Sequence, residues 1–295
     1  MKKSIVLLLF LLSSTTLLGC SSDDPHAGKH EYTLQFSALI GDKKLECGKE
    51  YKDIGKTKAS IQLLAFRFFV HDIKLVRKNG EKVPLELKQD KKWQYKNIAL
   101  LDFVNDTGKC KTGSPEVNEK VIGYAAKHDD YQGVSFQVGI PADLNNSVNA
   151  PIAPPPLNTS GMWWSWKGGF KYMRLDVKTD KHRTWFFHLG SSQCSGDLGK
   201  NYKCSKGNIS NIVLSNFAPG TNQVVFDALK LYKDIDLNAP IDPKKDENKD
   251  GKPDDTLPGC MFERDPECKM LFNHLGLHWG AKGGASLVQS VFSVK

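Results

Sequence analysis

Short runs of β-branched and aromatic residues, separated by Gly, Asn, Asp or Pro, recur along most of this 295-residue chain. They cover residues 31–40, 63–78, 93–104, 131–140, 170–179, 184–190, 211–217 and 222–232. Such runs are typical of strands, and the Asn79-Gly80 pair marks a hairpin turn. Helical periodicity is confined to 226–236 and 267–277. We therefore expect a mainly β protein, an antiparallel β-sandwich or barrel-like single domain with short helices.

The first 19 residues have the features of an export signal. Lys2 and Lys3 precede an apolar stretch that is too short and wrongly flanked for a stable membrane span. The stretch ends in Leu-Leu-Gly-Cys at 17–20, which resembles the lipobox of bacterial lipoproteins, in which the cysteine becomes the lipidated N-terminus. The alternative is a plain secretory signal with an incidental Cys20. Ser21 favours sorting to the outer membrane, facing the periplasm or the cell surface.

Composition divides the rest of the chain into a polar tether, residues 20–30, and one β domain, residues 31–295. The proline-rich segment 150–158 is unsuited to a central strand, and we expect it to form a covering loop. The formal net charge of +8 is spread out, with no Lys/Arg block of the kind that follows a phosphate backbone. Nucleic acid is therefore not an expected partner, whereas a membrane is, through the N-terminal lipid.

Seven cysteines are present, and lipidation of Cys20 leaves an even number, as expected for disulfides in an exported protein. Their spacing favours two local bridges, Cys194–Cys204 and Cys260–Cys268. The remaining pair, Cys47–Cys110, closes a long loop worth about 4 kcal/mol in the chain-entropy model. The alternative is a thiolate metal site, which the absence of any C-x2-C spacing disfavours.

An acidic stretch near the C-terminus has the spacing of a calcium loop. Its oxygen ligands would be Asp246, Asn248, Asp250 and Asp254, with Gly251 at the sharp turn. Leu257 stands where such a loop needs Glu, and no helices frame it. A solvated acidic loop is the alternative to a weak, structural calcium site.

Residues 161–177 hold three of the six tryptophans, followed by the Gly168-Gly169 pair. In an extended segment Met162, Trp164 and Trp166 share one face. Three large apolar side chains on one face are also what the core of a sheet requires, so core packing is the alternative to a functional role. The glycine pair predicts a bend or bulge. If Val177 pairs with Thr184, Met173 lies opposite His188. Simple alternation then puts His188 on the face away from Trp164 and Trp166, unless a bulge at the glycines reverses the alternation.

The eight histidines are scattered, with no H-x-H or H-E-x-x-H spacing, and neither a G-x-S-x-G elbow nor a phosphate loop occurs. The sequence therefore gives no catalytic motif, and we expect a protein that is not itself an enzyme.

Several segments together resemble the metallo-mystery-pair four-Cys-motif family, the MbnP-like copper-binding proteins. They are CGKEY (47–51), RFFVHDIKLV (67–76), WQYKNIALLDF (93–103), PPLNTSGMWWSWKGGFKYMRLD (155–176), HLGSSQC (188–194), FDALKLY (226–232), PGCMFERDPEC (258–268) and QSVFSV (289–294). The resemblance spans about residues 31–295. Its most specific part is the M-x-W-x-W string joined to HLGS-x-x-C.

This resemblance implies a secreted, β-rich protein that binds copper. It also implies a partner, a di-haem cytochrome c peroxidase-like enzyme of the MauG type, that oxidises a tryptophan to kynurenine. Indole is a poor metal ligand, whereas the amine and ketone of kynurenine can both face a metal, and imidazole completes a site suited to copper. Trp164, Trp166 and His188 match the family positions, and Met162 opens the same string.

One departure concerns a family Asn-His pair, in place of which this chain has Asn145-Asn146. His71 or His128 would then have to supply the missing ligand. Two other functions stay open: a metal-free lipoprotein whose aromatic residues hold a sugar or an apolar ligand, and a purely structural β-domain.

Overall fold

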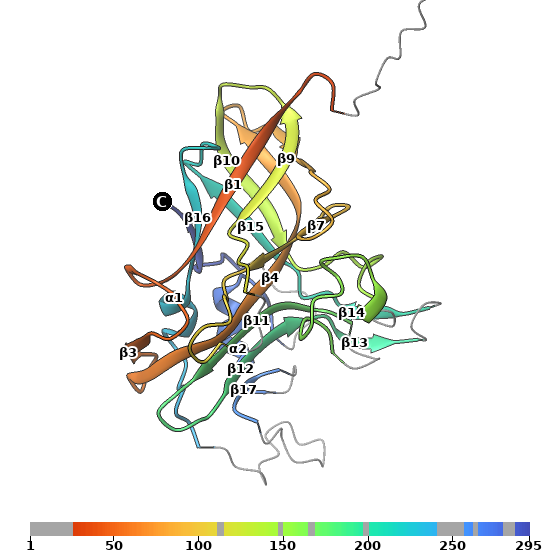
Figure 1. Cartoon of the computed structure of the whole chain (residues 1–295). Coiled ribbons are helices and arrows are strands. Elements are labelled where there is room, and N and C mark those ends of the chain that lie inside the picture. Colours follow the sequence, from red (N-terminus) through yellow and green to blue (C-terminus); the bar gives the residue numbers. More distant parts are fainter. Residues whose placement is uncertain are drawn as a thin grey trace, which may run out of the picture.

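The protein is a mainly β structure built from two large sheets and a short hairpin (Figure 1). The computed structural model describes residues 26–110, 115–146, 150–164, 169–196, 201–240, 257–261, 265–279 and 287–295. The six-stranded sheet contains β1 (Lys29–Ile40), β2 (Lys43–Lys44), β6 (Glu86–Leu87), β9 (Lys120–Ala126), β16 (Gln223–Asp227) and β18 (Phe292–Val294). Its main order is β18-β16-β1-β9-β6.

The ten-stranded sheet carries the residues that matter for function. Its strands are β3 (Glu50–Ile54), β4 (Ala59–Arg77), β5 (Lys82–Pro84), β7 (Gln94–Tyr95), β8 (Ile98–Asp102), β10 (Tyr131–Val138), β11 (Lys171–Lys178), β12 (Trp185–Gly190), β15 (Ser210–Ser215) and β17 (Gly259–Cys260). The main order is β15-β10-β4-β11-β12-β17. The 19-residue β4 runs through the middle and pairs with five other strands.

A hairpin, two short helices and a 3-10 turn complete the described part of the chain. The hairpin of β13 (Ser192–Ser195) and β14 (Lys203–Lys206) follows β12 directly. The helices are α1 (Ala228–Tyr232) and α2 (Cys268–His274), with a 3-10 turn η1 at Ala150–Ile152. Asp227 caps α1, because its carboxylate accepts the Leu229 N–H at 2.9 Å. Both helices lie where the sequence predicts them.

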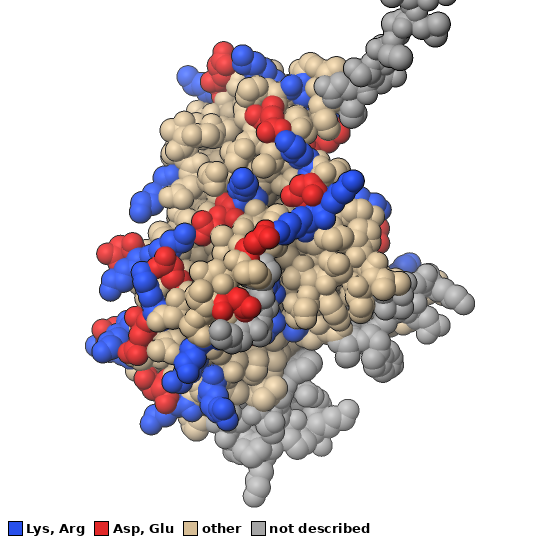
Figure 2. Space-filling view, viewed as in Figure 1, with Lys and Arg blue, Asp and Glu red and all other residues tan. Residues whose placement is uncertain are grey.

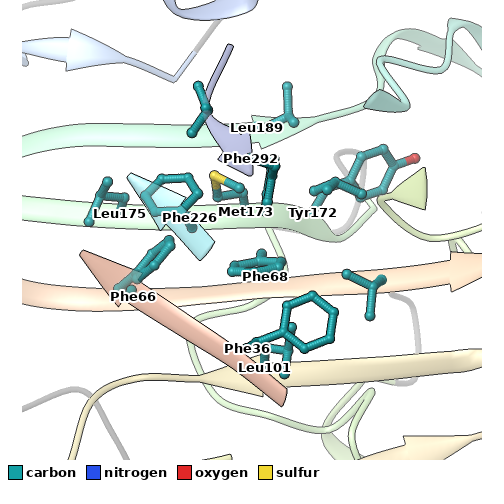
Figure 3. Close-up of a cluster of buried hydrophobic side chains, with 14 of the residues drawn as sticks. Phe36, Phe66, Phe68, Leu101, Tyr172, Met173, Leu175, Leu189, Phe226 and Phe292 are labelled. Atoms are coloured by element: carbon teal, nitrogen blue, oxygen red, sulfur yellow. The ribbon is translucent and has the colours of Figure 1, made fainter. Parts of the chain in front are cut away.

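The two sheets pack face to face over a core of phenylalanine rings (Figure 3). Phe36 of β1 lies 6.5 Å from Phe68 of β4, and Phe226 of β16 lies 4.5 Å from Phe66, measured between ring centroids. The inward residues of β11 and β12 extend this core. Residues 173, 175, 187 and 189 therefore face the other sheet, and residues 174, 176, 186 and 188 face outward.

The predicted fold class is confirmed in its main features: β-rich, few short helices and three disulfides. The sheets are mixed rather than purely antiparallel, since β1 pairs with β16 and β12 with β17 in parallel. The Asn79-Gly80 hairpin joins β4 to β5 as predicted, with the Arg77 N–H donating to the Glu81 carbonyl at 2.9 Å. The sequence predicted neither β9 nor β3, and it also missed the short strands β2, β6, β13, β14, β17 and β18.

All three predicted disulfides, Cys47–Cys110, Cys194–Cys204 and Cys260–Cys268, are present. The alternative of a thiolate metal site is therefore wrong for these six cysteines. On the face shown in Figure 2, Lys and Arg side chains are interspersed with Asp and Glu, in keeping with the absence of a basic block. In the described part of the chain, no helix has the length and apolarity that crossing a membrane requires.

Candidate functional site

The register between β11 and β12 decides which residues surround His188. Val177 pairs with Trp185, and Arg174 pairs with His188. The expected pairing of Val177 with Thr184, which sets Met173 opposite His188, is wrong by one residue. The turn explains the shift: the Thr179 N–H donates to the His182 carbonyl at 3.0 Å, so Arg183 and Thr184 together face only Lys178.

His188 is held by a buried carboxylate on the outward face of the ten-stranded sheet. Its Nε2 lies 2.8 Å from Asp176 Oδ1, and Arg174 Nε donates to Asp176 Oδ2 at 2.7 Å. Burial raises the pKa of Asp176, but the hydrogen bond from His188 and the charge of Arg174 outweigh it and hold the pKa below its usual value. Asp176 is therefore a buried anion that orients both partners.

The second ring nitrogen of His188 is the unusual feature of this site. Burial lowers the pKa of His188, which favours the neutral imidazole. Because Nε2 then carries the proton that it donates to Asp176, Nδ1 is left with a bare lone pair. Nδ1 is buried and has no hydrogen-bond partner among the described residues. An unpaired buried acceptor is costly, so it marks a position where a ligand would be stabilising.

The tryptophan segment forms a reversal of the chain, here called the tryptophan hairpin and defined by residues 162–164 and 169–171. Trp163 and Phe170 form an antiparallel bridge, and the Trp164 N–H donates to the Gly169 carbonyl at 3.0 Å. Gly169 has φ +65°, a conformation that glycine adopts easily. The predicted bend is confirmed at Gly169, while Gly168 lies outside the described residues.

Trp164 lies on the same face of β12 as His188. A Cβ added to Gly190 would lie 2.2 Å from Trp164 Cζ3, so the benzo ring rests directly on this glycine. Gly190 and His188 are two residues apart on a regular strand, about 6.6 Å along one face. Simple alternation would have separated His188 from Trp164. The other alternative, an irregularity that reverses the alternation, holds instead: the β11–β12 register shifts between Lys171 and Met173, and the hairpin folds Trp164 onto the outward face.

Met162 and Trp164 differ in burial. Met162 is fully buried and belongs to the hydrophobic core, while its carbonyl accepts the Lys171 N–H at 2.9 Å. Trp164 is only half-buried, so part of its indole meets solvent. Core packing thus accounts for Met162, but it does not account fully for Trp164.

Two cations flank His188 and Asp176. Lys171 begins β11, opposite Gly190, and burial together with the charge of Arg174 lowers its pKa to about 8. Both Lys171 and Arg174 also contribute, after burial, to lowering the pKa of His188. The two cations outnumber the single anion, Asp176, so the net charge around the His188 imidazole is positive in the absence of a ligand.

The structure does not bring the other candidate histidines to this site. The pairing Arg67–Arg174–His188 crosses three strands, and His71 lies four residues beyond Arg67 on β4, about 13 Å along the sheet. His71 is buried, with Nδ1 2.9 Å from the Gly139 carbonyl. His128 packs edge-on against Tyr131 at 5.5 Å, just before β10. Both histidines therefore lie away from His188 in the structure.

Several predicted residues lie outside the part of the chain that the structure describes. They are Cys20, Trp166 and the calcium candidates Asp246, Asn248, Asp250 and Asp254. Within the described residues, no group of three or more His, Cys, Asp or Glu side chains converges as a metal site. The described residues therefore offer His188 no second imidazole, thiolate or carboxylate arranged as a metal site, apart from the carboxylate of Asp176 that holds its Nε2.

Sequence reasoning missed the residues that support the site, namely Lys171, Arg174, Asp176 and Asn145. Arg174 and Asp176 are charged residues at alternate positions inside β11, among the apolar residues that separate its two terminal lysines, and that pattern is a usable signal for a buried pair. Asn145 is buried, with its Oδ1 accepting the Phe170 N–H at 2.9 Å. Asn146, beside it, is exposed.

Fold and site together define a class of protein: a disulfide-bonded β-sandwich with a carboxylate-held histidine beside a tryptophan hairpin. Comparison with known proteins agrees. The chain belongs to the MbnP family, whose family model matches residues 29–256. It is similar to the solved structure of MbnP from Methylosinus trichosporium, with a TM-score of 0.75 and 27% identity over 90% of this chain and 98% of that one. A search of the curated proteins finds no match.

Proposed function

We propose that this protein is an exported lipoprotein that binds copper at His188 and the tryptophan hairpin. In this proposal Cys20 carries the lipid, and the protein faces the periplasm or the cell surface, with the outer membrane favoured. It is not an enzyme but the substrate of a di-haem cytochrome c peroxidase-like partner of the MauG type, which converts Trp164 or Trp166 to kynurenine. Family membership and the geometry around His188 support the proposal.

The observation that carries the proposal is the buried Nδ1 of His188. Metal-binding imidazoles usually donate their other ring N–H to a carboxylate or a carbonyl, which fixes the tautomer and raises the basicity of the metal-binding nitrogen. Asp176 makes this contact at 2.8 Å and is itself held by Arg174. The arrangement thus prepares one nitrogen ligand in a water-poor position.

The residues around His188 favour a soft, singly charged ion. Lys171 and Arg174 place positive charge near the imidazole, and this charge opposes a divalent cation about twice as strongly as a monovalent one. Thioether and imidazole ligands suit copper(I) in the same way. We therefore expect copper(I) to bind more tightly than copper(II).

Trp164 is placed so that it can be modified and then contribute a ligand. Its benzo ring rests on Gly190, so the pyrrole half of the indole, which kynurenine formation opens, lies farther from the strand. The side chain is half-buried and therefore reachable by an enzyme at the surface. The modified residue gains one oxygen and loses one carbon, and its new amine and ketone remain beside His188.

Peptide mass spectrometry tests the modification. Protein purified from its own host, with the partner enzyme active, should show a peptide covering residues 162–171 that has gained one oxygen and lost one carbon. Fragmentation assigns the change to Trp164 or Trp166. An unmodified peptide alongside an active partner would remove the tryptophan from the proposal.

Equilibrium dialysis with copper(I) tests the metal site. His188→Ala should lose stoichiometric binding, and the matched control His30→Ala, at an exposed histidine, should bind as the wild type does. No stoichiometric binding by the wild type, with His188→Ala matching it, would favour the metal-free alternative, whereas full binding by both variants would place the copper away from His188. One cleft among the described residues, of about 360 Å³, lies beside Lys44, Glu46 and Phe103, and none of the tryptophan hairpin residues lines it.

A further inference from the structure

The disulfide of the β13–β14 hairpin is the most open of the three bridges. Cys194 and Cys204 are directly opposite each other in the hairpin, which projects from the body of the protein in Figure 1. Both cysteines are partly exposed. In the other two bridges Cys110, Cys260 and Cys268 are at most 1% exposed. The hairpin bridge is therefore the one in which both cysteines are partly exposed.

The base of the hairpin also favours opening of this bridge. Ser191 Oγ lies 3.2 Å from Cys204 Sγ and 3.6 Å from Cys194 Sγ, within reach of a hydrogen bond to a thiolate. Disulfide exchange is faster when the leaving thiolate is stabilised. Attack on Cys47 would instead release Cys110 into apolar surroundings, where a thiolate is disfavoured.

The same serine connects the disulfide to the tryptophan hairpin. Asn145 Nδ2 donates to Ser191 Oγ at 2.8 Å, and Asn145 Oδ1 accepts the Phe170 N–H at 2.9 Å. A Cβ added to Gly169 would lie 2.6 Å from that same Oδ1, so the amide packs directly on the turn. Because Asn145 is buried, water does not readily replace these bonds.

A second amide connects the far end of the hairpin to the residue beneath Trp164. Asn208, two residues after β14, donates from Nδ2 to the Gly190 carbonyl at 2.8 Å and to Ser192 Oγ at 3.2 Å. Gly190 is the residue on which the Trp164 ring rests. Both ends of the disulfide hairpin thus help to fix the surface that supports the tryptophan.

We propose that Cys194–Cys204 is a redox-active disulfide, opened by a dithiol reductant, and that its opening releases the tryptophan hairpin from β12. A thiolate of the reductant attacks Cys194 Sγ, and Cys204 leaves as a thiolate beside Ser191. The second thiol of the reductant then displaces Cys194, so two electrons and two protons pass to the protein and the reductant becomes a disulfide. Release of the tryptophan hairpin would weaken copper binding. Only this effect on copper rests on the proposed function.

Partial reduction of the full chain with dithiothreitol tests selectivity. Free thiols are alkylated and located by peptide mass spectrometry. Cys194 and Cys204 should be labelled at least about tenfold faster than the other four cysteines, in line with their exposure and leaving-group stabilisation. Labelling of Cys47 or Cys260 at the same rate or sooner would overturn the proposal.

Amide hydrogen exchange tests the coupling. In the selectively reduced protein, the Phe170 amide should exchange at least about fivefold faster, the change that loss of one net hydrogen bond produces. The Asn145→Ala variant with its disulfides intact should already show this faster exchange at Phe170, and reduction should increase its exchange rate little further. Ser205→Ala removes a 2.9 Å hydrogen bond to Gln193 within the same hairpin and should leave Phe170 unchanged.

Exchange at Phe170 that is the same before and after selective reduction would overturn the coupling. Copper does not enter either readout. Selective reduction with faster exchange, in a protein that binds no copper, would therefore keep this inference and refute the proposed function instead.

Discussion

Gly190→Ala tests the contact on which the site geometry depends. The added Cβ would lie 2.2 Å from Trp164 Cζ3, 2.4 Å from Cη2 and 2.8 Å from the Phe170 carbonyl oxygen. Carbon atoms in contact prefer about 3.5–4.0 Å, so the overlap with the ring exceeds about 1 Å. The ring and the tryptophan hairpin must therefore move outward, away from β12.

The magnitude follows from the cost of overpacking. Forcing a methyl group into a filled position costs about 1–3 kcal/mol in the free energy of unfolding. Trp164→Ala removes the side chain that overlaps most with the added methyl group. Gly190→Ala should therefore lower the free energy of unfolding by less in Trp164→Ala than in the wild type, and a double-mutant cycle measures the difference between the two losses. Gly207→Ala is the matched control, because its Cβ would meet nothing closer than 3.8 Å and its φ is ordinary.

Urea unfolding followed by circular dichroism measures the stability. Acrylamide quenching of tryptophan fluorescence measures the exposure of the indole. The fluorescence of Trp164 is obtained by subtracting the signal of the same protein carrying Trp164→Phe. Gly190→Ala should lower the stability and increase the quenching of Trp164, while Gly207→Ala should change neither. If Gly190→Ala behaves like Gly207→Ala, Trp164 does not rest on this glycine and the reasoning about the shared face fails.

Two further predictions concern the buried charges. Asp176→Asn leaves Arg174 and His188 with a neutral partner, so the free energy of unfolding, measured in urea, should fall by about 3 kcal/mol. The exposed control Asp72→Asn should change it by less than about 0.5 kcal/mol. A similarly small loss in both variants would contradict a buried ionic role for Asp176. Burial raises the pKa of Asp102 to about 6 despite the opposing charge of Arg67. The folded protein then binds this proton more tightly than the unfolded chain, so the contribution of Asp102 to stability falls as pH rises from about 4 to 6, by up to about 3 kcal/mol. Urea titrations at several pH values should show this loss in the wild type and not in Asp102→Asn. The prediction is contradicted if the free energy of unfolding changes with pH equally in the two proteins.

Local sequence patterns were enough to predict most of the longer strands, both helices and all three disulfides. Alternation, turn residues and cysteine spacing act over a few residues, so a single sequence records them. The strand β9 escaped because Gly123 interrupts it, and that glycine is required by a non-local contact: a Cβ there would lie 2.7 Å from the Glu86 carbonyl oxygen. The parallel pairings of β1 with β16 and of β12 with β17 likewise join distant segments.

The site was less predictable because one residue of register decides it. The extra residue at 183–184 changes the partner of His188 from Met173 to Arg174. Neither this bulge nor the folding of Trp164 onto Gly190 leaves a clear mark in the sequence. Asp176 and Asn145 act through partners 12 and 25 residues away, so their roles become visible only when the strands are paired.

The central claim is that His188 offers its buried Nδ1 to copper beside the tryptophan hairpin. Native mass spectrometry of protein purified from its own host and loaded with copper(I) tests this most directly. The account predicts one copper ion on the wild type and on His30→Ala, and none on His188→Ala that keeps the wild-type circular dichroism spectrum. A folded His188→Ala that retains its copper would contradict it.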